Sequence, residues 1–192
     1  MACEARRSGG FRATLTPVRC SGRGRRRLAM PAVSGFDAAM AKEIERKFLV
    51  KTSVWRAAAE HATAISQFYV TTGEDRSVRV RIVDGEKARL TIKFGGAART
   101  RDEFEYPIPL ADARDMERFA LGNIIQKTRH KVPHGGRDYE VDTFEGALAG
   151  LVIAELETPD DVPDDELPDW LGDEVTGDRA FYNLSLALEG AP

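Results

Sequence analysis

The stretch EIERKFLV, residues 43–50, places Glu43, Glu45 and Lys47 at every second position, with Ile44 and Phe48 among the residues between them. Successive side chains of a β-strand point to opposite faces, so this alternation predicts a strand with one charged and one apolar face. A single strand of this kind is typical of an antiparallel sheet with one face in water.

The same alternation recurs in six further stretches of the chain. The charged members of these stretches are Arg79, Arg81, Lys93, Glu103, Glu105, Lys127, Arg129, Lys131, Glu140, Asp142, Glu155 and Glu157. A face that is merely wet should also contain Thr, Ser and Gln, and neighbouring like charges such as Arg79 and Arg81 repel each other. The near absence of neutral polar residues therefore favours a face that binds charged ligands.

The pattern along the chain predicts a mainly β protein of the α+β class. Strands are expected at 43–50, 65–71, 77–83, 88–94, 102–108, 125–132, 137–144 and 151–158, with turns at TTGED, DGE, FGGAAR and HGGR. Helices are expected at 53–62, 112–121 (stopped by Gly122) and 179–188, and a surface connection with a short helical turn at 158–170. We expect an eight-stranded, antiparallel, closed β-barrel with the charged face inward and a few packing helices outside.

A charged tunnel of this kind indicates a specific chemistry. Clustered lysines and arginines suit a polyanion with several phosphates. Clustered carboxylates without Cys or His nearby suit Mg²⁺ or Mn²⁺, which would bridge the same phosphates. The two walls together predict phosphoryl transfer, because that reaction needs mainly positioning and charge neutralisation.

Composition divides the 192 residues into a basic leader and an acidic domain. Residues 1–40 hold eight arginines against two acids and both cysteines, Cys3 and Cys20, whereas residues 41–192 hold 20 basic against 29 acidic residues. We expect residues 1–40 to be a disordered leader, either a misassigned start or an organelle-targeting segment, followed by one domain at 41–192. The acidic charge of the domain argues against nucleic acid as a partner. No apolar run is long enough to span a membrane. We expect the protein to be located in the cytoplasm. A homodimer is left open.

Several motifs together resemble the CYTH domain, also called the triphosphate tunnel metalloenzyme family. They follow in order as EIERKFLV, Q-x-Y (Gln67, Tyr69), SVRVRI, TIKFG, EFEYPI, KTR (127–129), D-x-F-E-G-x-L-x-G-L (142–151), AELE (154–157) and EVTGD followed by YN. The resemblance implies hydrolysis or transfer of a triphosphate as small-molecule substrate. It implies metal ligands at Glu43, Glu45, Glu105, Asp142, Glu155 and Glu157, and phosphate ligands at Lys47, Arg79, Arg81, Lys93, Lys127 and Arg129. Lys47, Tyr69 and Lys127 are the catalytic candidates, although a strand Tyr can equally be a core residue.

The chain departs from the family pattern near its C-terminus, where Ala180 and Phe181 stand in place of a basic residue and Tyr. This departure weakens any cationic role for the last helix. The leading function is a metal-dependent triphosphatase acting on inorganic triphosphate or a related linear polyphosphate. The alternatives are an adenylyl cyclase, a thiamine triphosphatase and a polyphosphate-binding module without catalysis, which the E-x-E pairs at both ends of the domain disfavour.

Overall fold

The computed structural model describes residues 44–95 and 102–192. These residues belong to one compact unit, residues 40–192. The expected leader, the candidate ligand Glu43 and most of the FGGAAR turn lie outside the described residues. No helix of the described residues is long and apolar enough to cross a membrane.

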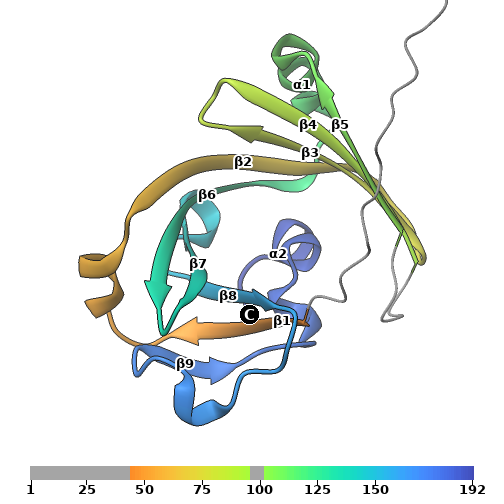
Figure 1. Cartoon of the computed structure of the whole chain (residues 1–192). Coiled ribbons are helices and arrows are strands. Elements are labelled where there is room, and N and C mark those ends of the chain that lie inside the picture. Colours follow the sequence, from red (N-terminus) through yellow and green to blue (C-terminus); the bar gives the residue numbers. More distant parts are fainter. Residues whose placement is uncertain (1–43, 96–101) are drawn as a thin grey trace, which may run out of the picture. The chain divides into compact units, whose positions relative to one another are not determined.

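Nine strands form one antiparallel sheet in the order β5-β4-β3-β2-β6-β7-β8-β1-β9 (Figure 1). They are β1 (Ile44–Val50), β2 (His61–Thr72), β3 (Arg76–Val83), β4 (Lys87–Phe94), β5 (Asp102–Ile108), β6 (Leu121–His134), β7 (Arg137–Phe144), β8 (Val152–Thr158) and β9 (Leu171–Glu174). All eight expected strands are present, which confirms the mainly β class.

The expectation of a closed, eight-stranded barrel is wrong. Among the described residues β5 pairs only with β4 and β9 only with β1, so the sheet stays open between β5 and β9. β9, four residues long, occupies the β1 edge that barrel closure would require. At the opposite edge β5 contains Pro107, which has no N–H group for a further ladder and is typical of an edge strand.

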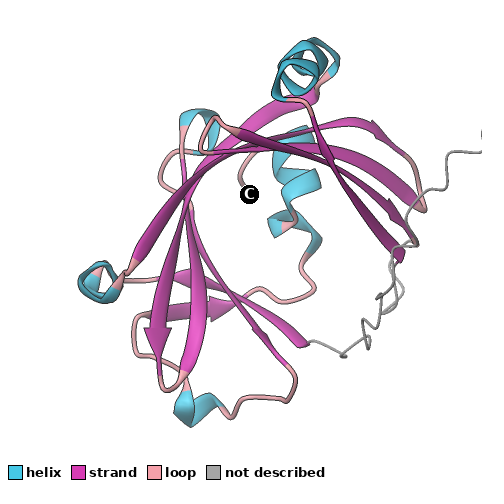
Figure 2. Cartoon of the chain, turned by 45° about the horizontal axis from the view of Figure 1, so that its top comes forward, coloured by secondary structure: helices cyan, strands magenta, loops and turns pink. Residues whose placement is uncertain are grey.

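Although open, the sheet is strongly curved around α2 (Asn183–Glu189), as Figure 2 shows. The register of β2 shifts between Tyr69 and Thr71 against β3, and between Gln67 and Tyr69 against β6. Such bulges bend a strand and increase its twist. The curvature at the centre of the sheet therefore coincides with the Q-x-Y motif.

The expected hairpin turns DGE and HGGR are confirmed. Asp84 and Gly85 have φ of 52° and 67° between β3 and β4, and Gly135 and Gly136 have φ of 59° and 76° between β6 and β7. Two successive residues with positive φ match the right-handed twist of the flanking strands. The Asp84 carboxylate also accepts a hydrogen bond from the Ala64 N–H at 2.9 Å, which ties this turn to β2.

The expected helix at 53–62 is wrong, because only a 3₁₀ turn forms, η1 (Val54–Ala58). Trp55 is buried, with its ring centroid 5.1 Å from that of His130. The Glu60 N–H donates to the Lys131 carbonyl at 3.0 Å, so β2 already begins at His61. Backbone pairing with β6 thus replaces the last turn of the expected helix.

The other two expected helices form with different bounds. Residues 110–119 fold as α1 (Leu110–Met116) and the 3₁₀ turn η2 (Glu117–Phe119), and β6 starts at Leu121. At the C-terminus the 3₁₀ turn η5 (Arg179–Phe181) precedes α2. Two further 3₁₀ turns are η3 (Gly146–Leu148) and η4 (Asp164–Glu166), the latter being the turn expected within 158–170.

The segment 158–170 is more than the surface connection that its Asp/Pro-rich composition predicts. Val162 and Trp170 are buried in a hydrophobic cluster. Arg46 of β1 holds the segment and β9 from the outside, donating to the Val162 carbonyl at 2.7 Å, to Asp164 Oδ1 at 2.9 Å and to both carboxylate oxygens of Glu174. The segment therefore covers part of the sheet and leads into the unexpected strand β9.

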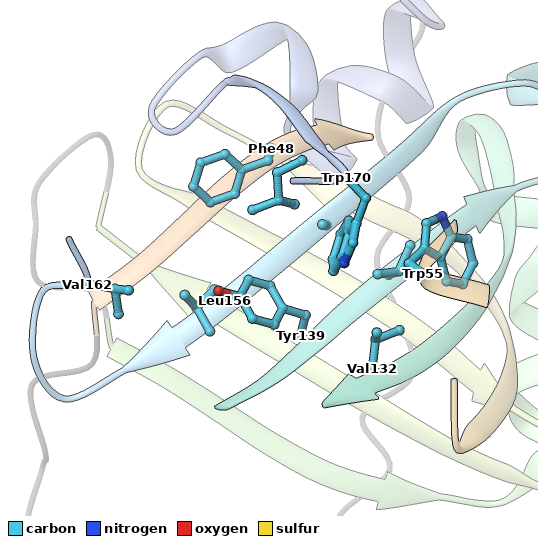
Figure 3. Packing of buried hydrophobic residues seen from close by; sticks show 10 residues of the cluster. Phe48, Trp55, Val132, Tyr139, Leu156, Val162 and Trp170 are labelled. Carbon is cyan, nitrogen blue, oxygen red and sulfur yellow. The ribbon is translucent and has the colours of Figure 1, made fainter. Parts of the chain in front are cut away.

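Hydrophobic clusters cover both faces of the sheet and show which way the charged residues point. We call the face that carries α2 the inner face and the opposite one the outer face. On the outer face, Val80 packs with Ala113 of α1, and a second cluster, drawn in Figure 3, includes Trp55, Trp170 and Leu156. The residues that alternate with these, such as Arg79 and Arg81 beside Val80, must point to the inner face.

One end of the inner face is closed by an apolar contact with α2. Leu186 and Ala187 pack there with Tyr69 and Ile125. Gly122 at the start of β6, with φ of 66°, permits this contact, because a Cβ atom built on it would lie 2.2 Å from the Ala187 carbonyl oxygen. Apart from Ile65 and Val83, the rest of the inner face between β1 and β4 carries mainly charged and polar side chains.

Candidate active site

The inner face gathers carboxylates from strands that are far apart in the sequence. Glu45 of β1 lies directly opposite Glu157 of β8, and Lys47 lies opposite Glu155. Glu155 is in turn opposite Glu140 of β7. Because directly opposed residues of antiparallel strands have Cβ atoms only about 4.5–5.5 Å apart, the strand register concentrates negative charge on β1, β7 and β8.

Arg129 of β6 binds the carboxylates at the centre of this group. Its Nε and Nη2 atoms donate to the two oxygens of Asp142, both at 2.7 Å, in a bidentate pair. Nη2 also lies 2.7 Å from Glu155 Oε2, and Nη1 donates to Glu140. Although burial opposes its charge, these neighbours hold the pKa of Arg129 above its ordinary value. Arg129 thus forms ion pairs with three carboxylates.

Lys127 is the most deeply buried cation of the site. Its Nζ atom donates to Asp142 Oδ2 at 2.5 Å and approaches Asn183 Oδ1 of α2 at 3.5 Å. Burial lowers the pKa of Lys127, an effect that Asp142 opposes. Burial also opposes ionisation of Asp142, but Lys127 and Arg129 hold the pKa of that carboxyl below its ordinary value. Asp142 is therefore ionised and shared by two cations.

Lys47 closes the same network from β1. Its Nζ atom lies 2.6 Å from Glu155 Oε1 and 3.3 Å from Glu45 Oε1. Burial works against the charge of Lys47, yet Glu155 and Glu45 hold its pKa above the ordinary value. The Lys47 N–H donates to Thr176 Oγ1 at 2.9 Å, so the EVTGD motif fixes the backbone that carries this side chain.

A second set of polar residues lies on strands β3, β4 and β5. Arg79 Nη2 donates to Thr91 Oγ1 at 3.2 Å and lies 3.5 Å from Glu105 Oε1. Thr91 Oγ1 donates to the same Glu105 oxygen at 2.8 Å. Lys93 Nζ pairs with Glu103 Oε2 at 2.7 Å nearer the sheet edge.

Arg81 differs from the five other candidate phosphate ligands, because no carboxylate of the described residues lies within ion-pair distance of it. Its Nε atom donates to the Gln67 side-chain oxygen at 3.2 Å. Burial, followed by the charges of Arg79 and Arg129, lowers the pKa of Arg81 to about 10. Positive charge is thus in local excess around Arg81.

Unpaired donors occur at the same place. Arg79 Nε and Gln67 Nε2 are buried and have no hydrogen-bond partner among the described residues. Buried polar groups are nearly always paired, so such groups in a native fold call for an explanation. Tyr69 lies close to the same arginines. Burial raises the pKa of its hydroxyl, and the positive charges of Arg79 and Arg81 act in the opposite direction. These groups together form a polar surface suited to an anion.

A pocket of about 420 Å³ opens beside the carboxylate network. It is lined by His61, Thr63, Arg129, Lys131, Asp138, Glu140, Glu155 and Glu157. Seven of these eight residues carry a charged or titratable side chain. The pocket is therefore suited to a small ionic ligand.

Comparison with known proteins agrees with this geometry. The family model of the CYTH domain matches residues 41–183, most of the chain. The chain belongs to the CYTH family.

Two curated relatives are similar to this chain over nearly their full lengths. The inorganic triphosphatase of Acetivibrio thermocellus is 40% identical over 148 residues, 77% of this chain and 94% of the relative. The inorganic triphosphatase of Nitrosomonas europaea is 35% identical over 151 residues, 76% of this chain and 97% of the relative. The crystal structure of the inorganic triphosphatase NE1496 superimposes with a TM-score of 0.61 at 30% identity, covering 78% of this chain and 97% of that one.

The CYTH domain brings most of the expected site residues to one face, in two groups. The first group contains Glu45, Lys47, Lys127, Arg129, Asp142, Glu155 and Glu157. The second group contains Tyr69, Arg79, Arg81, Lys93 and Glu105. Glu105 thus lies with arginines of β3 and β4 and apart from the other candidate metal ligands. Within residues 44–95 and 102–192, no three acidic, His or Cys side chains converge as a metal site.

Several residues of the site have no role assigned by the sequence. Gln67 and Thr91 are fully buried beside Arg81 and Arg79 of β3. Both are neutral, so a search for charged alternation passes over them, although their strand positions share the parity of the charged set. Asn183 reaches Lys127 from α2, and Phe181 packs in the inner apolar cluster. The turn η5 therefore contributes an apolar contact through Phe181, and the helix α2 contributes a polar one through Asn183.

Proposed function

We propose that this CYTH domain hydrolyses inorganic triphosphate bound on the inner face, with Mg²⁺ or Mn²⁺ as cofactor. The names of its two curated relatives, at 40% and 35% identity, support the substrate. The observation that carries the proposal is the Arg79–Arg81 pair. Among the described residues, Arg81 has no carboxylate within ion-pair distance and is held by Gln67. The Nε–H group of Arg79 is buried and has no acceptor there.

A linear triphosphate answers both features of that pair. Its phosphate oxygens accept charge-assisted hydrogen bonds from guanidinium groups, and its charge offsets the excess positive charge around Arg81. Lys93 extends the same surface toward the sheet edge, where Glu103 holds it. We assign Arg79, Arg81 and Lys93 to substrate binding.

The first group of site residues, on β1, β6, β7 and β8, is suited to a divalent cation because of the atoms that it offers as ligands. In the described part of the chain it offers carboxylate oxygens and no thiolate, and Mg²⁺ and Mn²⁺ prefer hard oxygen ligands. We assign Glu45, Glu155 and Glu157 to this role, with Glu43 as a further candidate from the same motif. A bound cation would supply neutralisation of the charge that develops on the phosphates.

The remaining candidate residues hold or assist the groups that bind the substrate and the metal. Asp142 is 1% exposed, binds Lys127 and Arg129 through its two oxygens and does not line the pocket, so we assign it to holding these two cations rather than to metal binding. Glu155 also contacts two cations, but it lines the pocket and keeps its assignment as a metal ligand. Lys47 and Lys127 stabilise the charge on the phosphates undergoing reaction, and Tyr69 orients the arginines or a phosphate oxygen. Glu105 positions Arg79 through Thr91.

The reaction on this surface is displacement at phosphorus by water. A water oxygen forms a new bond to a terminal phosphorus as the bond to the bridging oxygen breaks, giving phosphate and pyrophosphate. Such a transition state requires mainly alignment and charge stabilisation. The inner face supplies both, because carboxylates fix most of its cations and Gln67 holds Arg81.

Product analysis with inorganic triphosphate, ATP and thiamine triphosphate in parallel tests the proposal. We expect hydrolysis of inorganic triphosphate in Mg²⁺ or Mn²⁺ at the highest kcat/KM of the three. Conversion of ATP to cyclic AMP as the main reaction would replace the proposal by a cyclase, and preference for thiamine triphosphate would change the substrate. Tight triphosphate binding without turnover in either metal would leave a binding module.

A further inference from the structure

Gln67 occupies the centre of the inner face. It is 0% exposed and lies between Arg81 of β3 and Ile125 of β6, which are its directly opposed residues. Its Oε1 atom accepts from Arg81 Nε at 3.2 Å. An arginine side chain can only donate, so the amide oxygen must face Arg81, and Nε2 points elsewhere and is the buried donor without a partner.

Three cations of the site share one pattern of cross-strand neighbours. Opposite Arg129, Lys47 and Lys93 stand Asp142, Glu155 and Glu103. Each of these cations forms an ion pair with the carboxylate opposite it. These three cations are thus compensated by the residue directly across the ladder, whereas Lys127, opposite Phe144 and Ile65, is compensated diagonally by Asp142.

The arginines of β3 break this pattern. On β2 the residues opposite them are Tyr69 for Arg79 and Gln67 for Arg81. On β4 they are Thr91 for Arg79 and Arg89 for Arg81. None of these neighbours is acidic. Gln67 therefore stands opposite Arg81 where Lys47 and Lys93 each have a glutamate, a carboxylate of the same length.

We propose that Gln67 is a positioning residue that fixes the Arg81 guanidinium through Nε and leaves its positive charge uncompensated for the substrate. The inference rests on the proposed triphosphatase function and adds to it a determinant of substrate affinity. A glutamate here would orient Arg81 equally well but would neutralise it, and a residue without an acceptor would leave the charge but release the orientation. A neutral acceptor alone gives both.

The Arg81 hydrogen-bonding pattern agrees with this role. Arg81 contacts Gln67 through Nε, the guanidinium nitrogen nearest the strand. Among the described residues, this contact is the hydrogen bond that the Arg81 side chain donates. The terminal Nη atoms remain for a phosphate, which guanidinium groups bind through two parallel N–H bonds. Holding the group at Nε restricts its rotation before the substrate arrives, which lowers the entropic cost of binding.

Two substitutions separate charge from orientation. Gln67→Glu keeps the shape and the acceptor but adds a carboxylate, which Arg79 and Arg81 keep ionised. We expect KM for inorganic triphosphate to rise about tenfold or more, since a like charge is placed beside the bound anion, while the melting temperature is unchanged or higher. Gln67→Met removes the acceptor at similar volume without adding a charge, and because the orientation of Arg81 is lost we expect KM to rise severalfold, less than in Gln67→Glu.

Calorimetric binding of inorganic triphosphate to the metal-free full-length protein gives a second readout that does not depend on turnover. Gln126→Glu is the matched control, because it makes the same chemical change at an exposed position of β6. Its KM and affinity should equal those of the wild type. Circular dichroism and thermal unfolding establish that each variant is folded.

The outcomes distinguish this inference from the proposed function. Wild-type hydrolysis together with an unchanged KM and affinity in Gln67→Glu would overturn the role of Gln67 alone. Should Gln67→Glu not fold, wild-type kcat and KM in Gln67→Met would overturn it equally. A wild-type protein that neither binds nor hydrolyses inorganic triphosphate would overturn the proposed function, and the inference with it.

Discussion

Lys127 Nζ and Asp142 Oδ2 lie 2.5 Å apart, with 0% and 1% of their side chains exposed. The same aspartate binds Arg129 through both oxygens. One buried carboxylate thus compensates two cations, and Glu155 supplies the second negative charge beside Arg129. The arrangement fixes the cations of β6 before any substrate binds, which is the preorganisation that electrostatic catalysis requires.

Asp142→Asn should therefore lower the free energy of unfolding by about 3–5 kcal/mol, because it leaves the buried Lys127 ammonium and part of Arg129 uncompensated. Urea unfolding followed by circular dichroism measures the change. Asp138→Asn on the same strand is the control, since Asp138 is 56% exposed and pairs with the exposed Lys131. Its effect should stay within about 0.5 kcal/mol. Loss of activity at unchanged stability in Asp142→Asn would instead indicate a direct role in the reaction or in metal binding.

The same contacts predict how stability depends on acid pH. The folded-state pKa values of Asp142 and Glu155 lie below their ordinary values, despite burial, because of the neighbouring Lys127, Lys47 and Arg129. The unfolded chain therefore takes up protons first as the pH falls, so this stability is present above roughly pH 4–5 and is lost below it. Urea midpoints measured from pH 7 to pH 3 should fall more steeply for the wild type than for Asp142→Asn. Parallel curves would contradict the assignment.

Arg81→Ala should separate function from stability in the opposite way. The fold disfavours the charge of Arg81, whose pKa is lowered by burial and by Arg79 and Arg129. Removal should leave the melting temperature unchanged or raise it, while the rate of triphosphate hydrolysis falls by roughly 10²-fold, as for loss of one preorganised donor. Arg76→Ala is the control on the same strand, since its side chain is 62% exposed and pairs with Asp75. A destabilised Arg81→Ala variant with normal turnover would make Arg81 a structural residue.

The sequence predicts the faces of this sheet better than its edges. The sequence predicts eight strands, seven of them with a charged face, because period-2 patterning is local to each strand. Closure depends on what pairs with β1 and β5, and neither the four-residue β9 nor Pro107 carries a long-range signal. The expected helix at 53–62 fails for a related reason, because Trp55 and the pairing of Glu60 with Lys131 override local propensity.

The candidate site was predictable as a set of residues but not as a set of contacts. Register decides that Glu45 meets Glu157 while Glu105 meets Thr91, and register depends on turns and bulges that one strand does not encode. Gln67 shows the limit most clearly. Its value to the site lies in being uncharged among charged neighbours, which becomes visible only when the residues opposite it are known.

Gly122→Ala should test how α2 is held on the inner face. The added Cβ would lie 2.2 Å from the Ala187 carbonyl oxygen, at a φ of 66° that L-residues rarely adopt. Strain and overpacking together should cost about 2–4 kcal/mol of unfolding free energy in urea titrations. Gly136→Ala, with φ of 76° and no atom within 4 Å of the added Cβ, should cost only about 1–2 kcal/mol. Equal losses in the two variants would show that the α2 contact yields without cost.

The carboxylates of β1 and β8 should determine the metal requirement. Mg²⁺ prefers near-octahedral oxygen ligands at about 2.0–2.1 Å, whereas Ca²⁺ takes longer and looser bonds of about 2.3–2.6 Å. Because Glu45 and Glu157 are fixed opposite each other by the β1–β8 register, we expect Mg²⁺ or Mn²⁺ to support turnover, chelation to abolish it and Ca²⁺ to inhibit it. Glu45→Gln and Glu157→Gln each remove one anionic ligand at constant shape. Both should raise the Mg²⁺ concentration that gives half-maximal rate, measured by phosphate release at saturating triphosphate.

Glu103→Gln is the matched control for these two variants, because it makes the same change on β5, where Glu103 pairs with Lys93. Its Mg²⁺ requirement should equal that of the wild type, since the residue lies outside the β1–β8 group. A general loss of negative charge would shift all three variants alike, whereas direct ligation shifts only the first two. Hydrolysis that persists in excess chelator, or that runs equally fast with Ca²⁺ alone, would reduce Glu45 and Glu157 to counter-ions of the neighbouring cations and remove the metal from the mechanism.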